Sequence, residues 1–187
     1  MKVMGISGSP RKKGNTEMAV RLALEEIERQ GIDVEFVSLA GKEITPCNAC
    51  MSCKKSPKCV LEDDFQPIFE KIVEAEGLLV GSPVYFGSAT PETMALLDRL
   101  GYVARNNNNF LRHKVGGPVV VARRAGQNFT YAQLVFFYTI NEMIVVGSTY
   151  WNIAFGREKG EVTDDAEGVE TLRNFGKNVA WVLKKLY

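Results

Sequence analysis

Histidine is almost absent from the sequence: His113 is the only one, so no His-dependent metal site or catalytic triad can be assembled. Charge of one sign is also lacking, because 23 basic residues face 22 acidic ones and the net charge is +1. This balance gives no electrostatic case for a nucleic-acid or membrane partner. No apolar run is long enough to cross a bilayer. The N-terminus enters a strand without a signal pattern, so we expect a cytoplasmic protein.

Two glycine-rich phosphate motifs are missing as well. The dinucleotide pattern G-x-G-x-x-G would place glycines where this chain has Gly5, Ser7 and Pro10. Pro10 has no N–H to offer to a ligand and fixes its own φ angle. The triphosphate pattern G-x-x-x-x-G-K-[ST] does not occur. These absences argue against a dinucleotide or a nucleoside triphosphate on the first loop.

The pattern of apolar residues predicts alternating strands and helices over residues 1–187, which we interpret as one domain. The expected strands are 2–6, 33–39, 77–80, 118–122 and 143–147. The expected helices are 16–30, one capped by Asp63 or Asp64, one capped by Thr90, 127–142 and 164–186. Such alternation favours an α/β fold, a doubly wound five-stranded parallel sheet in the order 2-1-3-4-5 with helices on both faces. Ligands of such sheets bind beyond the carboxyl ends of the strands.

The loop after the first strand has the composition of an anion site. A strand, a small-residue loop and a helix N-terminus present free N–H groups and the positive end of the helix dipole. Hydroxyls, an amide that can cap the helix and an arginine that can fork onto phosphate oxygens are added to these groups. A simple turn would need neither so many donors nor an arginine. We therefore predict that a terminal phosphate is bound by Ser7, Ser9, Pro10, Arg11, Asn15 and Thr16.

This loop carries a family resemblance. The strings Ser7-Gly8-Ser9-Pro10-Arg11 and Gly14-Asn15-Thr16 resemble the FMN phosphate loop of the flavodoxin-like NADPH-dependent FMN reductases. The resemblance extends over most of the chain. It implies a flavodoxin-like FMN-binding domain and an FMN-containing oxidoreductase, in which the flavin itself carries the chemistry and no catalytic side chain is required.

Two further loops are expected to border the flavin ring. The string 81–88 combines small residues with two aromatics and matches the flavin loop of the same family, although its aromatics could instead pack under the next helix. By resemblance the ring lies along Pro83, Val84, Tyr85, Phe86 and Gly87. The string 122–127 leaves the fourth strand at the same end of the sheet. There we expect contacts from Arg124, Ala125 and Gly126, and we weigh this equally against Arg123 and Arg124 as a solvated surface pair.

Four cysteines form the sharpest signal after the phosphate loop. Cys47, Cys50 and Cys53 are separated by two residues each, and Cys59 follows five residues later in a cysteine-rich loop at 44–61. Two-residue spacings let consecutive thiolates turn toward one centre, as in runs that bind a [4Fe–4S] cluster. Zinc sites usually pair two C-x-x-C units across a longer stretch, so zinc is a weaker fit. A redox-active disulfide pair would need only two of the four.

The cysteine run resembles the cluster motif of the iron–sulfur flavoproteins, a branch of the same family in which it also follows the second strand. The resemblance implies a [4Fe–4S] cluster on Cys47, Cys50, Cys53 and Cys59. Lys54, Lys55 and Lys58 would partly offset the charge of four thiolates. The alternative is a set of reduced thiols without a cluster. The run Asn106–Asn109 is interpreted as a polar turn without functional role.

The resemblance implies that electrons pass from a donor, either ferredoxin or NAD(P)H, through FMN and the cluster to a small-molecule acceptor. It also implies a homodimer or a homotetramer that brings the cluster of one subunit near the flavin of another. Two alternatives stay open. One is a cluster-free NAD(P)H-dependent FMN or quinone reductase. The other is a non-enzymatic electron carrier or a redox sensor, of which the carrier is disfavoured because flavodoxins are typically acidic.

Overall fold

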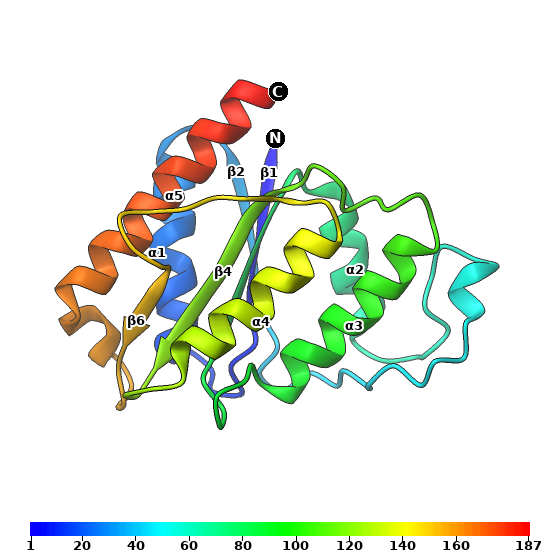
Figure 1. Cartoon of the computed structure of the whole chain (residues 1–187), viewed down its shortest axis with the longest axis horizontal. Coiled ribbons are helices and arrows are strands. Elements are labelled where there is room, and N and C mark those ends of the chain that lie inside the picture. Colours follow the sequence, from blue (N-terminus) through cyan, green and yellow to red (C-terminus); the bar gives the residue numbers. More distant parts are fainter.

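The computed structural model describes all 187 residues and contains one parallel sheet (Figure 1). The strands lie in the order β2-β1-β3-β4-β5, and β6 pairs with β4 beyond β5. The order predicted from the sequence is therefore confirmed. The strands are β1 (Lys2–Ser7), β2 (Asp33–Ser38), β3 (Gly77–Pro83), β4 (Val115–Ala122), β5 (Ile144–Val145) and β6 (Ile153–Phe155).

Helices cover both faces of the sheet. On one face lie α1 (Asn15–Arg29) and α5 (Ala166–Leu186), and on the other lie α2 (Phe65–Glu74), α3 (Pro91–Arg105) and α4 (Gln127–Ile140) (Figure 1). Two short 3-10 helices, η1 (Ser52–Lys54) and η2 (Glu161–Asp164), lie in the connections. None of the helices combines the length and the apolar character that a membrane crossing requires.

The period of two along each strand divides the core into two layers. Met4 and Ile6 of β1 pack with α2, α3 and α4, whereas Val3 of the same strand packs with α1 and α5. In β4, Val120 faces the first group of helices and Val121 faces the second. Strands that are apolar on both faces are expected for a parallel sheet that helices cover on both sides.

The fifth strand differs from the prediction because it is divided in two. Only Ile144 and Val145 of the predicted 143–147 form β5, which pairs with the start of β4, whereas β6 pairs with the end of β4. The intervening residues leave the sheet edge. Asn152 fills the gap. Its side-chain Nδ2 donates to Pro118 O of β4 (3.2 Å), and its backbone O accepts from Val120 N of β4 (2.9 Å). A three-residue strand carries too little pattern to be recognised from sequence.

The carboxyl ends of three strands meet at one edge of the sheet, the lower edge in Figure 1. Ser7 at the end of β1 is the register partner of Gly81, and Pro83 at the end of β3 is the partner of Val121. The loop after β2 instead leads sideways, past α3, into the cysteine-rich loop, which we call the cysteine segment (residues 44–61). One chain therefore builds two candidate sites on either side of α3.

Candidate functional site

The loop between β1 and α1 is fixed by buried contacts with its neighbours. Gly8 N donates to Gly81 O (2.7 Å), and Thr90 Oγ1, at the N-cap of α3, donates to Gly8 O (2.7 Å). A Cβ atom on Gly8 would lie 1.7 Å from Thr93 Oγ1, so no other residue fits without displacing α3. The backbone of this loop is therefore held in place before any ligand arrives.

The hydroxyl groups predicted to bind phosphate lie inside this loop. Ser7 is fully buried, and its Oγ has no hydrogen-bond partner. A buried polar atom left unpaired costs about 1–3 kcal/mol, so this hydroxyl points to a partner that belongs in the site. Ser9 and Thr16 are buried beside it, and Ser9 Oγ accepts from Arg11 N (3.2 Å). The free N–H groups at the start of α1 complete a setting that favours an anion.

Asn15 has a different role from the helix cap that its position suggested. Gly14 occupies the N-cap of α1 and no side chain caps the helix. Asn15 Nδ2 instead donates to Glu158 O (2.8 Å), and its Oδ1 accepts from Gly160 N (2.7 Å). The side chain thereby ties the phosphate loop to the segment that follows β6. This contact could not be predicted, because Asn15 and its two partners are more than 140 residues apart in the chain.

An open cleft of about 430 Å³ lies beside these residues. Seven of the residues predicted from sequence line it, namely Ser9, Arg11, Asn15, Thr16, Pro83, Val84 and Tyr85. Its wall also includes residues that the sequence did not indicate, namely Gly14, Val121, Arg123, Gly156, Arg157, Glu158 and Lys159. Four of the lining side chains are basic and one is acidic, so the cleft favours an anionic ligand.

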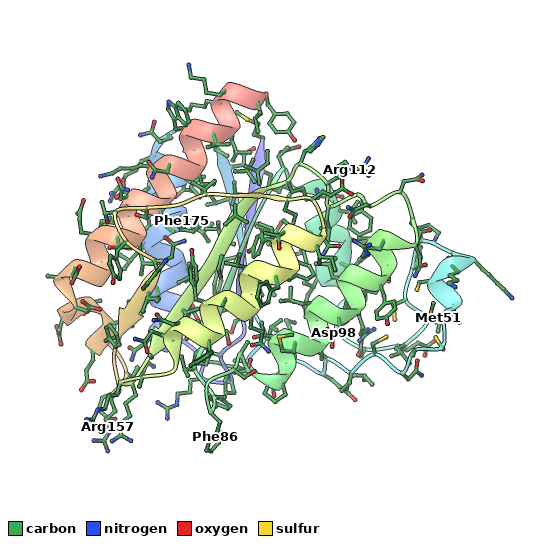
Figure 2. All side chains as sticks on the ribbon, viewed as in Figure 1. Met51, Phe86, Asp98, Arg112, Arg157 and Phe175 are labelled. Carbon is green, nitrogen blue, oxygen red and sulfur yellow. The ribbon has the colours of Figure 1, made fainter.

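The loop after β3 forms a tight turn at the mouth of the cleft. Tyr85 and Ser88 exchange backbone hydrogen bonds of 2.8 and 3.0 Å, and Phe86 and Gly87 between them have φ angles of 51° and 81°. Two positive φ angles in a two-residue turn are typical of a type I′ hairpin. Phe86 is fully exposed and points away from the molecule (Figure 2). Phe86 and Gly87 do not line the cleft in this structure, whereas Pro83, Val84 and Tyr85 do.

The loop after β4 contacts the same turn. Gly126 has a φ of 87°, and a Cβ atom there would lie 2.9 Å from Val84 Cγ1, so glycine permits the close approach. Arg123 lines the cleft together with Val121, two residues earlier. Arg124 and Ala125 do not line the cleft, although they lie in the same exposed bend after β4 as Arg123. The structure therefore puts Arg123, rather than Arg124, against the space next to the predicted ring loop.

The segment Gly156–Gly160 is the part of the cleft wall that sequence reasoning missed. Glu161 Oε2 accepts from Arg157 N (2.7 Å) and Glu158 N (2.8 Å), which shapes the turn. These hydrogen bonds, from Glu158 first and then from Arg157, lower the pKa of the Glu161 carboxyl. The signal available in the sequence was the apolar string 153–155 followed by Gly156 and Gly160, which enclose two basic residues, Arg157 and Lys159.

The four cysteines surround one hollow at the far side of α3. The hollow is lined by Cys47, Cys50, Cys53 and Cys59 together with Met51, Leu61, Arg99, Tyr102, Val103 and three further residues of the cysteine segment. All four thiols are free. The hollow measures about 20 Å³, and the side chains do not form a ready set of three or more ligands for a metal ion. The four cysteines predicted from the sequence thus line one hollow, and their role as ligands stays a prediction.

The backbone around Cys50 is unusual. Ala49 and Met51 have φ angles of 54° and 59°, so the exposed Cys50 stands between two non-glycine residues in the left-handed region. Hydrogen bonds from the side chain and then the backbone of Ser52 lower the pKa of the Cys50 thiol. Such a thiol is more readily converted to the thiolate that binds iron or reacts with oxidants.

Side chains of α3 and of the turn after it bind two of the other three sulfurs. Arg99 Nε donates to Cys59 Sγ (3.3 Å), and Asn106 Nδ2 donates to Cys53 Sγ (3.3 Å). Asn107 Nδ2 donates to Cys53 O (2.9 Å). The run Asn106–Asn109 therefore does more than form a turn, because two of its amides bind the cysteine segment.

A buried ion pair lies behind the cysteines. Arg99 Nη1 and Asp63 Oδ2 are 2.5 Å apart, and both side chains are 1% exposed. Burial raises the pKa of Asp63, but hydrogen bonds from Arg99, Thr45 and Phe65 outweigh it and lower the pKa to about 2. Burial lowers the pKa of Arg99, whereas the bonds to Asp63 and Cys59 raise it, and the net shift is upward. Sequence reasoning expected Asp63 only as a helix cap and did not find Arg99.

Comparison with known proteins agrees with these features. The family model of the NADPH-dependent FMN reductases matches residues 1–158. An iron–sulfur flavoprotein of Methanocaldococcus jannaschii is 44% identical, with 98% of each chain covered. An iron–sulfur flavoprotein of Methanosarcina thermophila is 36% identical, with 98% of this chain and 96% of the relative covered.

A solved structure agrees with the fold. The flavodoxin-type, WrbA-like protein of Agrobacterium tumefaciens superposes with a TM-score of 0.71 over 98% of each chain, at 15% identity. Identity this low supports the arrangement of strands and helices and leaves the ligand to be argued from the residues themselves.

Proposed function

Because the chain belongs to the NADPH-dependent FMN reductase family, in its iron–sulfur flavoprotein branch, it is an FMN-containing oxidoreductase, and we propose that it relays electrons between FMN and a [4Fe–4S] cluster. Bound FMN would supply two-electron hydride chemistry and one-electron transfer. The observation that carries the proposal is the buried Ser7 Oγ, which has no partner within the chain. A phosphate oxygen at the start of α1 would give this hydroxyl the acceptor that it lacks.

In this proposal, the phosphate and the ring of the flavin contact different residues of the site. Ser7, Ser9 and Thr16 would donate hydroxyl groups to the phosphate, and Arg11 would add a charged donor. Asn15 would act indirectly, because its side chain is already engaged by Glu158 and Gly160. Pro10 is exposed and outside the cleft wall, so its part is to shape the turn.

The ring would lie between the two loops that follow β3 and β4. Pro83, Val84 and Tyr85 offer apolar and aromatic cover, and Gly126 lets the second loop approach the first. Arg123 would bring positive charge to the flavin ring or to the chain that links the ring to the phosphate. The sequence predicts this role for Arg124 instead. Phe86, Gly87 and Ala125 would border the ring if their loops close over it.

The cysteine hollow would hold the cluster. Its donor set fits, since four free thiols face one space and two of them already accept N–H donors, as cluster sulfurs commonly do. The hollow of about 20 Å³ is too small for a cluster, so the exposed cysteine segment would have to open outward. Cys47, Cys50, Cys53 and Cys59 would be the ligands.

The electron donor in this proposal is ferredoxin or NAD(P)H, and the acceptor is a small molecule. We further propose a homodimer or a homotetramer, since the cleft and the cysteine hollow lie on opposite sides of α3 within one chain. The aromatic residues Phe129 and Phe136 on the outer side of α4 are exposed and support such an assembly.

A cluster-free NAD(P)H-dependent FMN or quinone reductase is the second candidate. It is favoured by the small volume of the hollow and by the absence of a ready-made set of metal ligands. Such a protein would bind FMN in the same cleft and would leave the cysteines as thiols.

The experiment that separates the two candidates is a measurement of FMN, iron, sulfide and zinc in protein purified without oxygen. About four irons and four sulfides per chain, with FMN absorbance, would support the cluster relay. FMN without iron would overturn the relay and leave the reductase, and absence of FMN would overturn both. Reduced ferredoxin, NADH and NADPH would then be compared by the rate at which each bleaches the flavin.

A further inference from the structure

Arg99 is the only arginine among the buried residues of the chain, and it lies in the middle of α3. A guanidinium carries five N–H donors and a permanent charge, so burying it is costly unless the donors find partners. Nothing in the FMN cleft requires this residue. The burial of Arg99 therefore needs an explanation outside the FMN cleft.

The partners of Arg99 come from both ends of the cysteine segment. Nη1 donates to Thr45 O (3.1 Å) ahead of the first cysteine, and to Asp63 Oδ2 (2.5 Å) after the last. Nη2 donates to Leu61 O (3.3 Å). The guanidinium also stacks 4.1 Å from the ring centre of Phe65. One side chain thus joins the entry and the exit of the segment.

Asp63 completes this closure. Its Oδ2 accepts from Thr45 N (2.7 Å) and its Oδ1 accepts from Phe65 N (3.0 Å). The carboxylate neutralises the guanidinium and binds the same two ends of the segment. Next to it, Glu43 N donates to Asp64 Oδ2 (2.8 Å), so the base of the segment is closed without any bond to a cysteine sulfur.

The Nε–H donor of Arg99 takes no part in closing the base of the segment. Nε points to Cys59 Sγ at 3.3 Å, and a neutral thiol is a weak acceptor. A sulfur that binds iron carries more negative charge, and hydrogen bonds to ligand sulfurs are among the factors that set a cluster's potential. A donor here also fixes the direction in which the sulfur points, as supporting groups do at well-ordered metal sites.

We propose that Arg99 is the positioning residue of the cysteine site, closing the segment at both ends and orienting Cys59 through the Nε–H···Sγ bond. The inference deepens the proposed function, since it rests on the four cysteines being cluster ligands. The Nε–H···Sγ bond would stabilise the greater negative charge on the ligand sulfur of a reduced cluster, so Arg99 would hold the cluster potential higher than it would otherwise be.

The test compares Arg99→Lys with Arg105→Lys. Lysine keeps the charge and can still reach Asp63, but it lacks the planar fork and the Nε donor. Arg105 is the matched control, because it is exposed on the same helix and has no contact with a cysteine. Each protein is made without oxygen, and the midpoint potential of the cluster is measured by a titration that follows its spectrum. FMN content is recorded in the same samples.

The second readout needs no cluster. Iron is removed with a chelator, and the rate of thiol labelling is measured at each cysteine by mass spectrometry. In Arg99→Lys we expect Cys59 to react about fivefold more slowly, because the reactive thiolate loses a hydrogen bond worth about 1 kcal/mol. Cys50, which does not contact Arg99, should react at the wild-type rate. Arg105→Lys should match the wild type at both cysteines.

A lower midpoint potential together with slower labelling of Cys59 supports the proposal. Wild-type potential and wild-type labelling in Arg99→Lys overturn it, as does an equal rise in labelling at all four cysteines. If the wild-type protein contains no iron, the cluster relay fails, and the labelling rates still decide whether Arg99 positions Cys59. The two failures are therefore distinguishable.

Discussion

The phosphate loop and the cysteine segment follow neighbouring strands of the same sheet, yet they are held by different means. The phosphate loop is anchored by backbone groups at the sheet edge, such as Gly8 N on Gly81 O. The cysteine segment is anchored mainly by side chains, namely the buried ion pair of Arg99 and Asp63 and the amides of Asn106 and Asn107. Backbone anchoring tolerates side-chain changes that avoid steric clashes. A segment held by a few side chains depends on each of them.

Replacing one cysteine gives the largest effect expected from this contrast. If the four cysteines act as a set, Cys50→Ala should remove essentially all bound iron and leave FMN content unchanged, because the cleft lies on the other side of α3. Iron, sulfide and FMN analysis of anaerobic protein measures this. Met51→Ala, next in sequence and also lining the hollow, serves as the control and should keep its iron. Full iron content in Cys50→Ala would remove Cys50 from the ligand set.

Breaking the ion pair should come next in size. Asp63→Ala leaves the Arg99 guanidinium buried without its counter-charge, which typically costs about 3–5 kcal/mol of the free energy of unfolding. Denaturant unfolding of the FMN-bound protein measures this loss. Glu62→Ala is the matched control, since its carboxylate, one residue away, is exposed and makes no hydrogen bond or ion pair. We expect its cost to stay below about 1 kcal/mol. Equal effects of the two variants would contradict the special place of Asp63.

Acid should weaken the same anchor without a mutation. The pKa of Asp63 is lowered to about 2 in the folded protein, below its usual value of 3.8. The carboxylate therefore contributes stability that is fully present above about pH 4 and is lost as the pH falls toward 2, by about 2 kcal/mol in total. Unfolding free energies at a series of pH values, in wild type and Asp63→Asn, test this. The variant should lack this part of the acid dependence.

The smallest effect is expected at the phosphate loop, where many groups share the ligand. Arg11→Ala should weaken FMN binding by about 1–3 kcal/mol, and the exposure of Arg11 favours the lower end. Lys12→Ala changes the same charge one residue away, outside the cleft wall, and should bind FMN nearly as well. Fluorescence titration of apoprotein with FMN compares them. Unchanged affinity in Arg11→Ala would remove this arginine from the site.

The same contrast explains how much could be predicted from the sequence. The phosphate loop is continuous in the chain, so its hydroxyls, its arginine and its place after β1 could be predicted from one string. The sheet order could be predicted from the alternation of strands and helices along the chain. The second wall of the cleft, Gly156–Lys159, could not, because it depends on β6 and on contacts between distant residues such as Asn15 and Gly160.

Arg99 illustrates a signal that was present and was not used. Its spacing from Leu96 and Val103, three and four residues away, places it on the buried face of α3. A charged residue within an apolar helical stripe predicts a buried partner, although the pattern cannot name Asp63 or Cys59 as that partner. The position of Arg124 was missed because both arginines lie in a bend beyond the end of β4, where no strand or helix period tells which of them lines the cleft.

Helix α3 is capped by Thr90, which binds the phosphate loop, and nine residues later it carries Arg99, which binds the cysteine segment. At the usual rise this is about 13–14 Å along the axis, and at the usual pitch about two and a half turns. The helix therefore fixes the angle between Thr90 and Arg99 about its axis, which we call the phase, as well as the distance between them. One residue inserted between them would rotate Arg99 by about 100° away from Cys59 while both sites kept all their residues. Insertions in the cysteine segment would leave that phase untouched, so length changes are tolerable in the loop and not in the helix.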